Sequence, residues 1–355
     1  DVGHIVDLEF RKEQIKIQNY PIIRGHAPLR ISFAGGGTDI PYFYEKYGGV
    51  VINATIDKYC HATAVKRADS KIILNSDMTG EMLIDSLDSI HYDGNMDLIK
   101  AAIKYLKPSF GLELYLHNDL PPGRGLGSSA SLAVLITSII SKLDSMNLDD
   151  YKIAEVAHHI EREELNIKGG WQDQYAAVTG GFVFMEFNKE KNIIYPLKLK
   201  EDTIKELNEH LLLCYVGQSH DSGKVHEKQE HSFMQNESER AEQLNELKEI
   251  AIETKNCLLT NQLASLGKLF HRSWDIKREF GTTDTHIDRL YSIGLKNGVQ
   301  GGRLLGAGDG GYILCYHDPK QRNKLTKALT EEGGEILDFN FEFSGTKTWT
   351  APSKM

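Results

Sequence analysis

The sequence predicts a two-domain α+β protein, and three observations support this fold class. The chain has 355 residues, which is more than one compact core usually holds. Strand patterns are mixed with helical patterns in both halves of the chain. Around residues 195–200, a strand-rich pattern gives way to long polar helices. We therefore expect an N-terminal extension at 1–20, a first domain at 21–198 and a second domain at 199–355.

In the first domain, short runs of apolar and β-branched residues predict most of the strands. These strands are expected at 22–34, 50–56, 60–65, 112–116, 182–187 and 193–199, with a further strand signal at 72–74. Helical spacing of apolar residues marks 95–106 and 151–166, and Gly169-Gly170 should follow the end of the second helix. Residues 130–143 are apolar nearly all round, which is typical of a buried helix.

The second domain should combine a few strands with longer amphipathic helices. Strands are expected at 211–216 and 312–316. Apolar residues at helical spacing predict an amphipathic helix from Leu244 to Leu258, and the charges between residues 237 and 255 form its solvated face. Near the end of the chain, strict alternation predicts one late, half-buried strand that carries Leu337, Phe339, Phe341 and Phe343.

The composition, with 40% hydrophobic and 26% charged residues, is that of a globular protein. The net charge of −9 argues against a nucleic-acid partner, which normally requires a basic face. The longest apolar run is far shorter than the roughly 20 residues that span a bilayer, and the N-terminus does not resemble a secretory signal. The four separated cysteines are interpreted as buried free thiols. We expect a cytoplasmic monomer or homodimer without membrane association.

Glycine is the informative excess, because many of the 32 glycines fall in three clusters. The central cluster, residues 121–131, reads Pro-Pro-Gly-Arg-Gly-Leu-Gly-Ser-Ser-Ala-Ser. Alternate glycines let the backbone curl with its N–H groups inward, and the following helix N-terminus favours an anion. We interpret this segment as a phosphate-binding loop rather than a serine-capped turn. It is not a Walker A loop, because no Gly-Lys-Ser/Thr follows.

The other two clusters are less specific. Residues 306–311 contain G-x-G-x-x-G, but a strand follows where a dinucleotide-binding motif needs a helix, so we reject that interpretation. Two interpretations of residues 306–311 remain. The segment could be a turn whose backbone approaches a phosphate or the first cluster, or it could be a tight β-turn. The first cluster, Gly35-Gly36-Gly37-Thr38-Asp39, follows a strand that carries Arg30. Asp39 could accept hydrogen bonds from hydroxyl groups, or it could be the aspartate of a turn or a helix N-cap.

Together, segments 28–39, 122–130 and 305–311 resemble the three motifs of the GHMP small-molecule kinases, in the family's order and across nearly the whole chain. The central motif is the most specific. The first is similar to that of the D-glycero-D-manno-heptose 7-phosphate kinase group, with fucokinase-like kinases nearby. The resemblance implies a ribosomal-protein-S5-like N-terminal domain, a ferredoxin-like C-terminal domain and an active site in the cleft between them.

The resemblance further implies ATP and Mg²⁺ as cofactors. Backbone amides of the central motif would wrap the ATP phosphates, and the motif comprises Pro122, Gly123, Arg124, Gly125, Leu126, Gly127, Ser128, Ser129 and Ala130. Ser129 would place its hydroxyl on Mg²⁺. Glu161 matches the family's magnesium carboxylate, an oxygen ligand of the kind that Mg²⁺ prefers. Glu163 and Glu164 are alternatives for this ligand, and each of the three also fits a surface charge.

Catalytic residues follow from the resemblance in the same way. Segment 169–175 matches the region where galactokinase-like members carry the aspartate that faces the acceptor hydroxyl, so Asp173 is the candidate general base. Arg30 matches the arginine that pairs with this aspartate and would neutralise the transferring charge. A helix cap for Asp173 and a strand-edge salt bridge for Arg30 are the alternatives.

Asp39 matches the aspartate that hydrogen-bonds sugar hydroxyls. Galactokinases carry Glu-His where this chain has Gly36-Gly37, which favours a larger or differently shaped sugar. Further substrate contacts are expected from Gly170, Ser222, Lys224, Arg303 and Gly308. In the heptose group an arginine and a serine are expected near 217–224. This chain has His220, Ser222 and Lys224 there instead, so a role of these residues in binding the substrate phosphate is a hypothesis.

The activity implied by the resemblance is ATP-dependent phosphorylation of the anomeric C1 hydroxyl of D-glycero-D-manno-heptose 7-phosphate, giving the 1,7-bisphosphate. Such a step belongs to nucleotide-activated heptose biosynthesis for surface polysaccharide. The alternatives are a fucokinase-like kinase of a neutral sugar and a non-catalytic sensor of sugar and ATP. Retention of Ser129, Glu161 and Asp173 together argues against the sensor.

Overall fold

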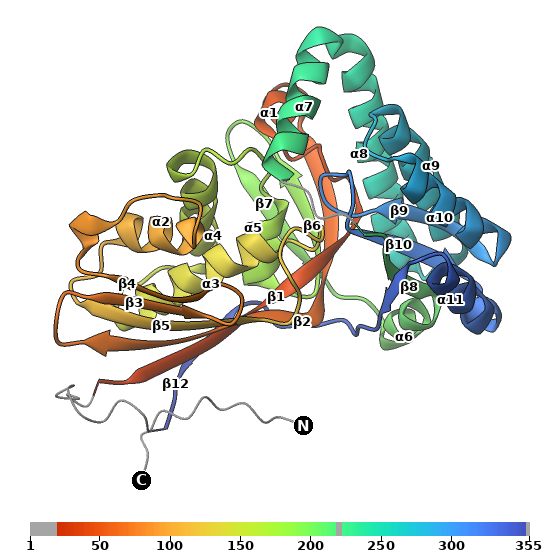
Figure 1. The fold of residues 1–355 in the computed structure, drawn as a ribbon. Coiled ribbons are helices and arrows are strands. Elements are labelled where there is room, and N and C mark those ends of the chain that lie inside the picture. Colours follow the sequence, from red (N-terminus) through yellow and green to blue (C-terminus); the bar gives the residue numbers. More distant parts are fainter. Residues whose placement is uncertain (1–19, 218–221, 353–355) are drawn as a thin grey trace.

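The computed structural model describes residues 20–217 and 222–352, which form two sheets covered by helices (Figure 1). In the first sheet the strand order is β12-β1-β2-β5-β3-β4, and β6 pairs with β2 and β7 with β6. Its strands are β1 (Ile22–Ala34), β2 (Gly49–Arg67), β3 (Ile72–Ser76), β4 (Gly80–Ile84), β5 (Gly111–Asn118), β6 (Phe182–Phe187), β7 (Asn192–Leu197) and β12 (Lys347–Thr350).

Helices α2 to α5 lie together on one side of strands β1 to β5 (Figure 1). They are α2 (Asp97–Leu106), α3 (Ser128–Leu143), α4 (Asp150–His159) and α5 (Gln172–Thr179), and the short α1 (Pro41–Tyr47) follows β1. The predicted buried helix is confirmed, since most side chains of α3 are buried. The helix predicted over 151–166 is shorter: α4 ends at His159 and continues as a π-helical turn, Ile160–Glu164.

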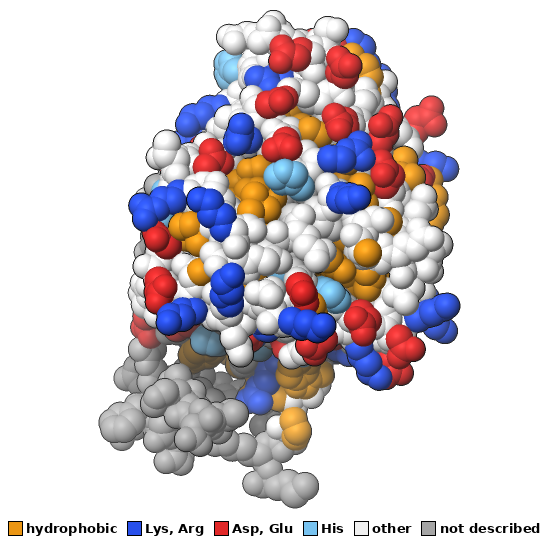
Figure 2. Space-filling model, turned by 90° about the vertical axis from the view of Figure 1, so that its right-hand side faces the viewer, with side chains coloured by type: hydrophobic (Ala, Val, Ile, Leu, Met, Phe, Trp, Pro, Cys, Tyr) orange, Lys and Arg blue, Asp and Glu red, His pale blue; other side chains and the backbone are white. Residues whose placement is uncertain are grey.

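The second sheet has the order β11-β8-β10-β9, all antiparallel. Its strands are β8 (Leu211–Tyr215), β9 (Val299–Leu304), β10 (Tyr312–His317) and β11 (Glu335–Leu337). The accompanying helices are α6 (Glu201–His210), α7 (Ser222–Gln235), α8 (Glu237–Thr260), α9 (Leu266–Glu279), α10 (Thr285–Lys296) and α11 (Arg322–Glu331). Figure 2 shows acidic and basic side chains interspersed on the face toward these C-terminal helices.

Two sequence-based expectations about strands are wrong. The two strands predicted at 50–56 and 60–65 form one long strand, β2, whose pairing with β1 shifts register beside Pro28. The late strand predicted over Leu337–Phe343 is not formed, because this segment passes from one sheet to the other. Leu337 pairs with β8, whereas Phe341 forms an isolated bridge to Ile56 of β2.

The end of the chain therefore returns to the first sheet, where β12 pairs with β1. The domain limits at 20 and 198 stay a prediction, and the structure adds that residues 347–350 lie outside the second sheet. A cluster of aromatic rings connects the two parts: Phe33 of β1 has its ring centroid 6.0 Å from that of Phe270 in α9 and 6.3 Å from that of Phe341. These aromatic contacts hold α9 against the first sheet.

Candidate active site

The central glycine cluster forms a loop that leads directly into α3. Gly123, Gly125 and Gly127 have φ angles of 77°, 83° and 76°, a left-handed conformation that other residues rarely adopt. Gly127 is the N-cap of α3 and offers no side chain to cap the first turn. Since the first backbone N–H groups of a helix lack partners within the helix, this end of α3 suits an anion.

The third cluster packs on the central one, rather than on the first. A Cβ atom added at Gly125 would lie 2.8 Å from the carbonyl oxygen of Leu305, and one at Gly306 would lie 2.7 Å from the Cα of Gly125. Only glycine permits this approach of two backbones. Gly308 packs against Thr282, where an added Cβ would lie 2.5 Å from the Thr282 Cβ. The third cluster therefore supports the shape of the central loop.

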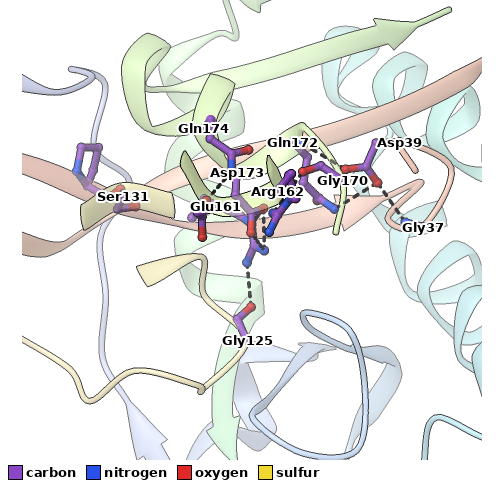
Figure 3. Close-up of polar contacts among 12 residues, drawn as sticks. Gly37, Asp39, Gly125, Ser131, Glu161, Arg162, Gly170, Gln172, Asp173 and Gln174 are labelled. Carbon is purple, nitrogen blue, oxygen red and sulfur yellow. Dashed lines mark hydrogen bonds and ion pairs between the residues drawn. The ribbon is translucent and has the colours of Figure 1, made fainter. Parts of the chain in front are cut away.

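Arg30 and Asp173 form an ion pair at the centre of the site, and Figure 3 labels Asp173 and Gly125, the two residues to which the Arg30 side chain donates. Arg30 Nε donates to Asp173 Oδ1 at 2.7 Å and Arg30 Nη2 donates to Asp173 Oδ2 at 2.8 Å, a bidentate ion pair. Arg30 Nη1 donates to the carbonyl oxygen of Gly125 at 2.6 Å, which ties the pair to the glycine loop. The Arg30 side chain is 4% exposed and that of Asp173 is 21% exposed, so the carboxylate remains reachable by a substrate.

Ser129 and Glu161 meet beside the N-terminus of α3. Ser129 Oγ donates to Glu161 Oε1 at 2.6 Å. Gln174 donates to the second carboxylate oxygen of Glu161 (Figure 3). Glu161 is 2% exposed and lies in the π-helical turn, where Leu165 N donates to the carbonyl oxygen of Ile160. Such turns widen a helix locally and often occur at functional sites.

The pair of Ser129 and Glu161 fits a magnesium ion in its chemistry. A hydroxyl and a carboxylate are hard oxygen ligands, and Mg²⁺ usually takes one or two carboxylates with phosphate oxygens and water. Among the residues that the structure describes, no group of three or more His, Cys, Asp or Glu is placed to hold a metal. Ser129 and Glu161 would therefore supply two of the ligands of the ion, and phosphate oxygens of the nucleotide and water would supply the others.

Asp39 is buried at the end of the first cluster and faces the loop before α5 (Figure 3). It accepts hydrogen bonds from Gly37 N at 3.1 Å and from Gln172 N at 3.1 Å, with Gln172 Nε2 at 3.3 Å. Burial raises the pKa of Asp39 above its ordinary value, although the backbone hydrogen bond from Gln172 opposes this shift. A Cβ at Gly170 would lie 2.0 Å from Asp39 Oδ2, so Gly170 is required for this contact.

The remaining predicted substrate residues occupy different surroundings. Arg303 of β9 is buried beside Gly36, and burial, with the charge of Arg30 second, lowers its pKa. Lys224 of α7 is exposed and lines an outer groove with Glu227 and His231. Ser222 begins α7, and its side chain lies outside the described part of the chain. His220 lies outside the described residues, and a role for His220, Ser222 and Lys224 stays a prediction.

Three residues that the sequence-based reasoning did not select also belong to this region. Gln172 and Gln174 flank the proposed base and bind Asp39 and Glu161 through their side-chain amides. Lys277 of α9 points its ammonium at the first cluster, 3.4 Å from where a Cβ on Gly37 would lie. Lys277 lies at helical spacing from Phe270 and Trp274, on the apolar face of α9. A lysine at such a position is the sequence feature by which it could have been predicted.

Comparisons with known proteins identify the family. The profile of the GHMP kinases N terminal domain matches residues 97–181, and that of the GHMP kinases C terminal region matches 254–335. The chain is 35% identical over 336 residues to D-glycero-alpha-D-manno-heptose 7-phosphate kinase from Campylobacter jejuni, covering 92% of this chain and 98% of that protein. The chain belongs to the GHMP kinase family. It is a sugar kinase, a phosphotransferase that acts on a hydroxyl group and uses ATP.

Solved structures agree with this assignment. A D-glycero-D-manno-heptose 1-phosphate kinase from Bacteriodes thetaiotaomicron superposes with a TM-score of 0.79 at 28% identity, covering 93% of this chain and all of that one. Galactokinase from Lactococcus lactis, solved with galactose, has a TM-score of 0.76 at 21% identity over 92% of this chain and 95% of its own, which supports the fold alone. The predicted GHMP kinase fold is thereby confirmed. Within the described residues, no helix of this sugar kinase is long and apolar enough to cross a membrane.

Proposed function

We propose that this sugar kinase transfers the γ-phosphoryl group of ATP to the anomeric C1 hydroxyl of D-glycero-D-manno-heptose 7-phosphate, giving the 1,7-bisphosphate. The proposal rests on the bidentate ion pair of Arg30 and Asp173. Arg30 also donates a hydrogen bond to Gly125 of the glycine loop, and the Asp173 side chain is partly exposed. Support for the sugar comes from the Campylobacter jejuni relative, which is named a heptose 7-phosphate kinase.

Asp173 acts as the acceptor of the proton on the attacking hydroxyl. Its bidentate contact with Arg30 fixes the position of the carboxylate, and a strong base is not needed because phosphoryl transfer passes through a loose transition state. Orientation of the hydroxyl therefore matters more than the strength of the base. Arg30 holds both carboxylate oxygens, so the rotamer of Asp173 is set before the sugar arrives.

The ATP phosphates bind along the loop 122–130, where the backbone N–H groups at the start of α3 face them. Ser129 and Glu161 would hold Mg²⁺, whose charge offsets that of the phosphate oxygens. In the structure the Ser129 hydroxyl donates to Glu161, and turning it would free oxygen atoms of both side chains for the ion. Gln174 keeps the Glu161 carboxylate in place in either arrangement.

Asp39 binds hydroxyls of the sugar at the acceptor side of the site. Its two oxygens already accept bonds from Gly37 and Gln172, which aim the carboxylate and leave it lone pairs for a ligand. The absence of side chains at Gly36 and Gly37 leaves room for a seven-carbon sugar, which is the reason to prefer a heptose to galactose.

A coupled assay of ADP release tests the proposal directly. The panel contains the heptose 7-phosphate, the heptose 1-phosphate, the unphosphorylated heptose, fucose and galactose. We expect the highest kcat/KM with the 7-phosphate and a product whose new phosphorus signal couples to the anomeric proton in NMR. A preference for fucose, a new ester away from C1, or ATP binding without ADP release would contradict the proposal.

A further inference from the structure

Two buried cations near the first glycine cluster form no ion pair with any described residue. Arg303 is 3% exposed, and its Nε and Nη1 atoms have no hydrogen-bond partner within residues 20–217 and 222–352. Lys277 is 8% exposed, and its ammonium makes no hydrogen bond or ion pair with any residue that the structure describes. Because burying an unpaired charge is costly, cations in such positions usually await a ligand or have a partner.

The Arg303 guanidinium and the Lys277 ammonium both lie close to Gly36-Gly37, so the two cations face the same space. A Cβ at Gly36 would lie 3.6 Å from Arg303 Nη2, and a Cβ at Gly37 would lie 3.4 Å from Lys277 Nζ. Burial lowers the pKa of Lys277 to about 8, with repulsion from Arg303 as the second cause and Asp39 opposing it. Two neighbouring polar atoms, Ser32 Oγ and Gln172 Oε1, are also buried and have no hydrogen-bond partner among the described residues.

Helix α7 contributes His226 to the same surroundings. Its Nδ1 is buried and has no hydrogen-bond partner in the part of the chain that the structure describes. Burial, followed by the charges of Arg162 and Lys277, lowers the pKa of His226 to about 4, so this imidazole is neutral near pH 7. It adds hydrogen-bonding capacity without adding to the charge that a ligand must balance.

The carboxylates nearby do not fully balance Arg303 and Lys277. Asp173 is held by Arg30. The charge of Asp39 acts on Lys277, but no ion pair joins the two among the described residues, and Asp39 is hydrogen-bonded by Gly37 and Gln172. A phosphate ester supplies two negative charges and three acceptor oxygens, which suits a guanidinium fork beside an ammonium. A neutral sugar would fill the same space and leave both cations unpaired.

We propose that Lys277 and Arg303 bind the phosphate ester that the sugar substrate already carries, and so select a sugar phosphate over the free sugar. This inference rests on the proposed function, because it concerns the acceptor side of the same site. Lys277 approaches Asp39 and Gly37, and Arg303 approaches Gly36, whereas the ATP loop lies at the α3 N-terminus against Arg30 and Gly125. The charge of Arg30 also acts on Arg303, so Lys277 is the cation whose position assigns the phosphate to the acceptor rather than to the nucleotide.

Kinetics of Lys277→Met with a matched pair of substrates test the proposal. We expect kcat/KM for the heptose 7-phosphate to fall at least about 30-fold, the effect of truncating one member of a buried charge pair. The kcat/KM for unphosphorylated heptose and the KM for ATP should stay within about twofold, and Lys277→Arg should restore part of the loss. Lys268→Met, an exposed lysine of the same helix, is the control and should behave as wild type.

An equal loss for both sugars, or a rise in the KM for ATP alone, would overturn the inference. If Lys277→Met does not fold, Gly36→Ala tests the same point, because its methyl would lie at van der Waals distance from Arg303 and narrow the space while keeping both charges. It should weaken use of the sugar phosphate more than use of the free sugar, and the reverse order would overturn the inference.

Calorimetric titration separates failure of this inference from failure of the proposed function. If no sugar on the panel is phosphorylated, the proposed function fails. Tight binding of heptose 7-phosphate to the wild type, lost in Lys277→Met and kept in Lys268→Met, would then still support the phosphate-binding site. If the sugar phosphate is turned over equally well by Lys277→Met and wild type, the proposed function stands and the inference fails.

Discussion

Two cationic regions of this site differ in how their charge is balanced. Arg30 uses its guanidinium on both oxygens of Asp173 and on the carbonyl of Gly125, all within the chain. Arg303 and Lys277 have no comparable anion among the described residues. The paired region is organised in advance for chemistry, whereas the unpaired region gains its partner when an anionic ligand binds.

The largest effect should come from breaking the paired region with Asp173→Asn. The substitution keeps the shape of the side chain but removes the proton acceptor and the charge that holds Arg30. We expect kcat to fall by about 10²–10⁴, as is typical when a general base is lost. Measurements of ADP release give kcat, and calorimetry should show that the sugar phosphate still binds.

Asp202→Asn on the exposed start of α6 is the matched control and should leave kcat unchanged. Turnover by Asp173→Asn within about threefold of wild type would exclude Asp173 as the base, whatever the affinity for the sugar.

Glu161→Gln removes a charge from the proposed metal ligand while keeping its size. Gln174 has an amide oxygen without a partner, so a flip of its amide can meet the new donor and preserve the fold. We expect the Mg²⁺ concentration for half-maximal rate to rise at least about tenfold, since even outer ligand partners contribute 10–100-fold to metal affinity. Titration of the rate with Mg²⁺ measures this.

Glu163→Gln provides the comparison, because Glu163 lies in the same turn and is exposed. If Glu163→Gln rather than Glu161→Gln shifts the Mg²⁺ requirement, the ligand assignment moves to Glu163.

Gly170→Ala should disturb the acceptor side through a steric clash. The new methyl would lie 2.0 Å from Asp39 Oδ2, so the loop or the carboxylate must move. We expect a loss of about 1–3 kcal/mol in the free energy of unfolding, as for other overpacked sites. Denaturant unfolding measures it. Gly36→Ala, whose methyl meets no atom closer than 3.4 Å, should unfold like the wild type, and equal losses in both would contradict the packing around Asp39.

The smallest effect concerns pH. Because burial lowers the pKa of Lys277 to about 8, its positive charge fades as the pH rises from 7.5 to 9. We expect the KM for the sugar phosphate to rise roughly three- to tenfold over this range, following the deprotonated fraction. In Lys277→Arg the KM should stay level, because a guanidinium keeps its proton. A rise of equal size in that variant would assign the effect to another group.

The lowered pKa of Lys277 also affects the free energy of unfolding. A rise in pH that weakens substrate binding should stabilise the unliganded fold. The folded protein binds fewer protons at Lys277 than the unfolded chain does between about pH 8 and the ordinary lysine pKa of 10.5. This group alone therefore makes the unliganded protein more stable as the pH rises through that window.

Most local elements were predictable, and the exceptions have physical causes. β1 and α3 appear close to their expected limits because their apolar patterns are strong and continuous. The alternation from Leu337 to Phe343 was misleading, since the segment serves two sheets and Phe341 packs with Phe33 instead of extending a strand. The π-helical turn at Glu161 was missed, because it lies at the end of the helix, where no further turns follow that could show a shift of the apolar period.

The sequence by itself determined where the backbone curls to receive phosphate and which buried helix follows, because glycine φ freedom and apolar periodicity are local properties. The tertiary structure alone decided which charges are balanced. Arg30 and Asp173 are 143 residues apart in the chain and become partners only when β1 meets α5. Lys277 and Arg303 come from α9 and β9, and only their packing around Gly36-Gly37 leaves two cations buried side by side. Whether a charge is paired depends on distances between side chains, and those distances exist only in the folded chain.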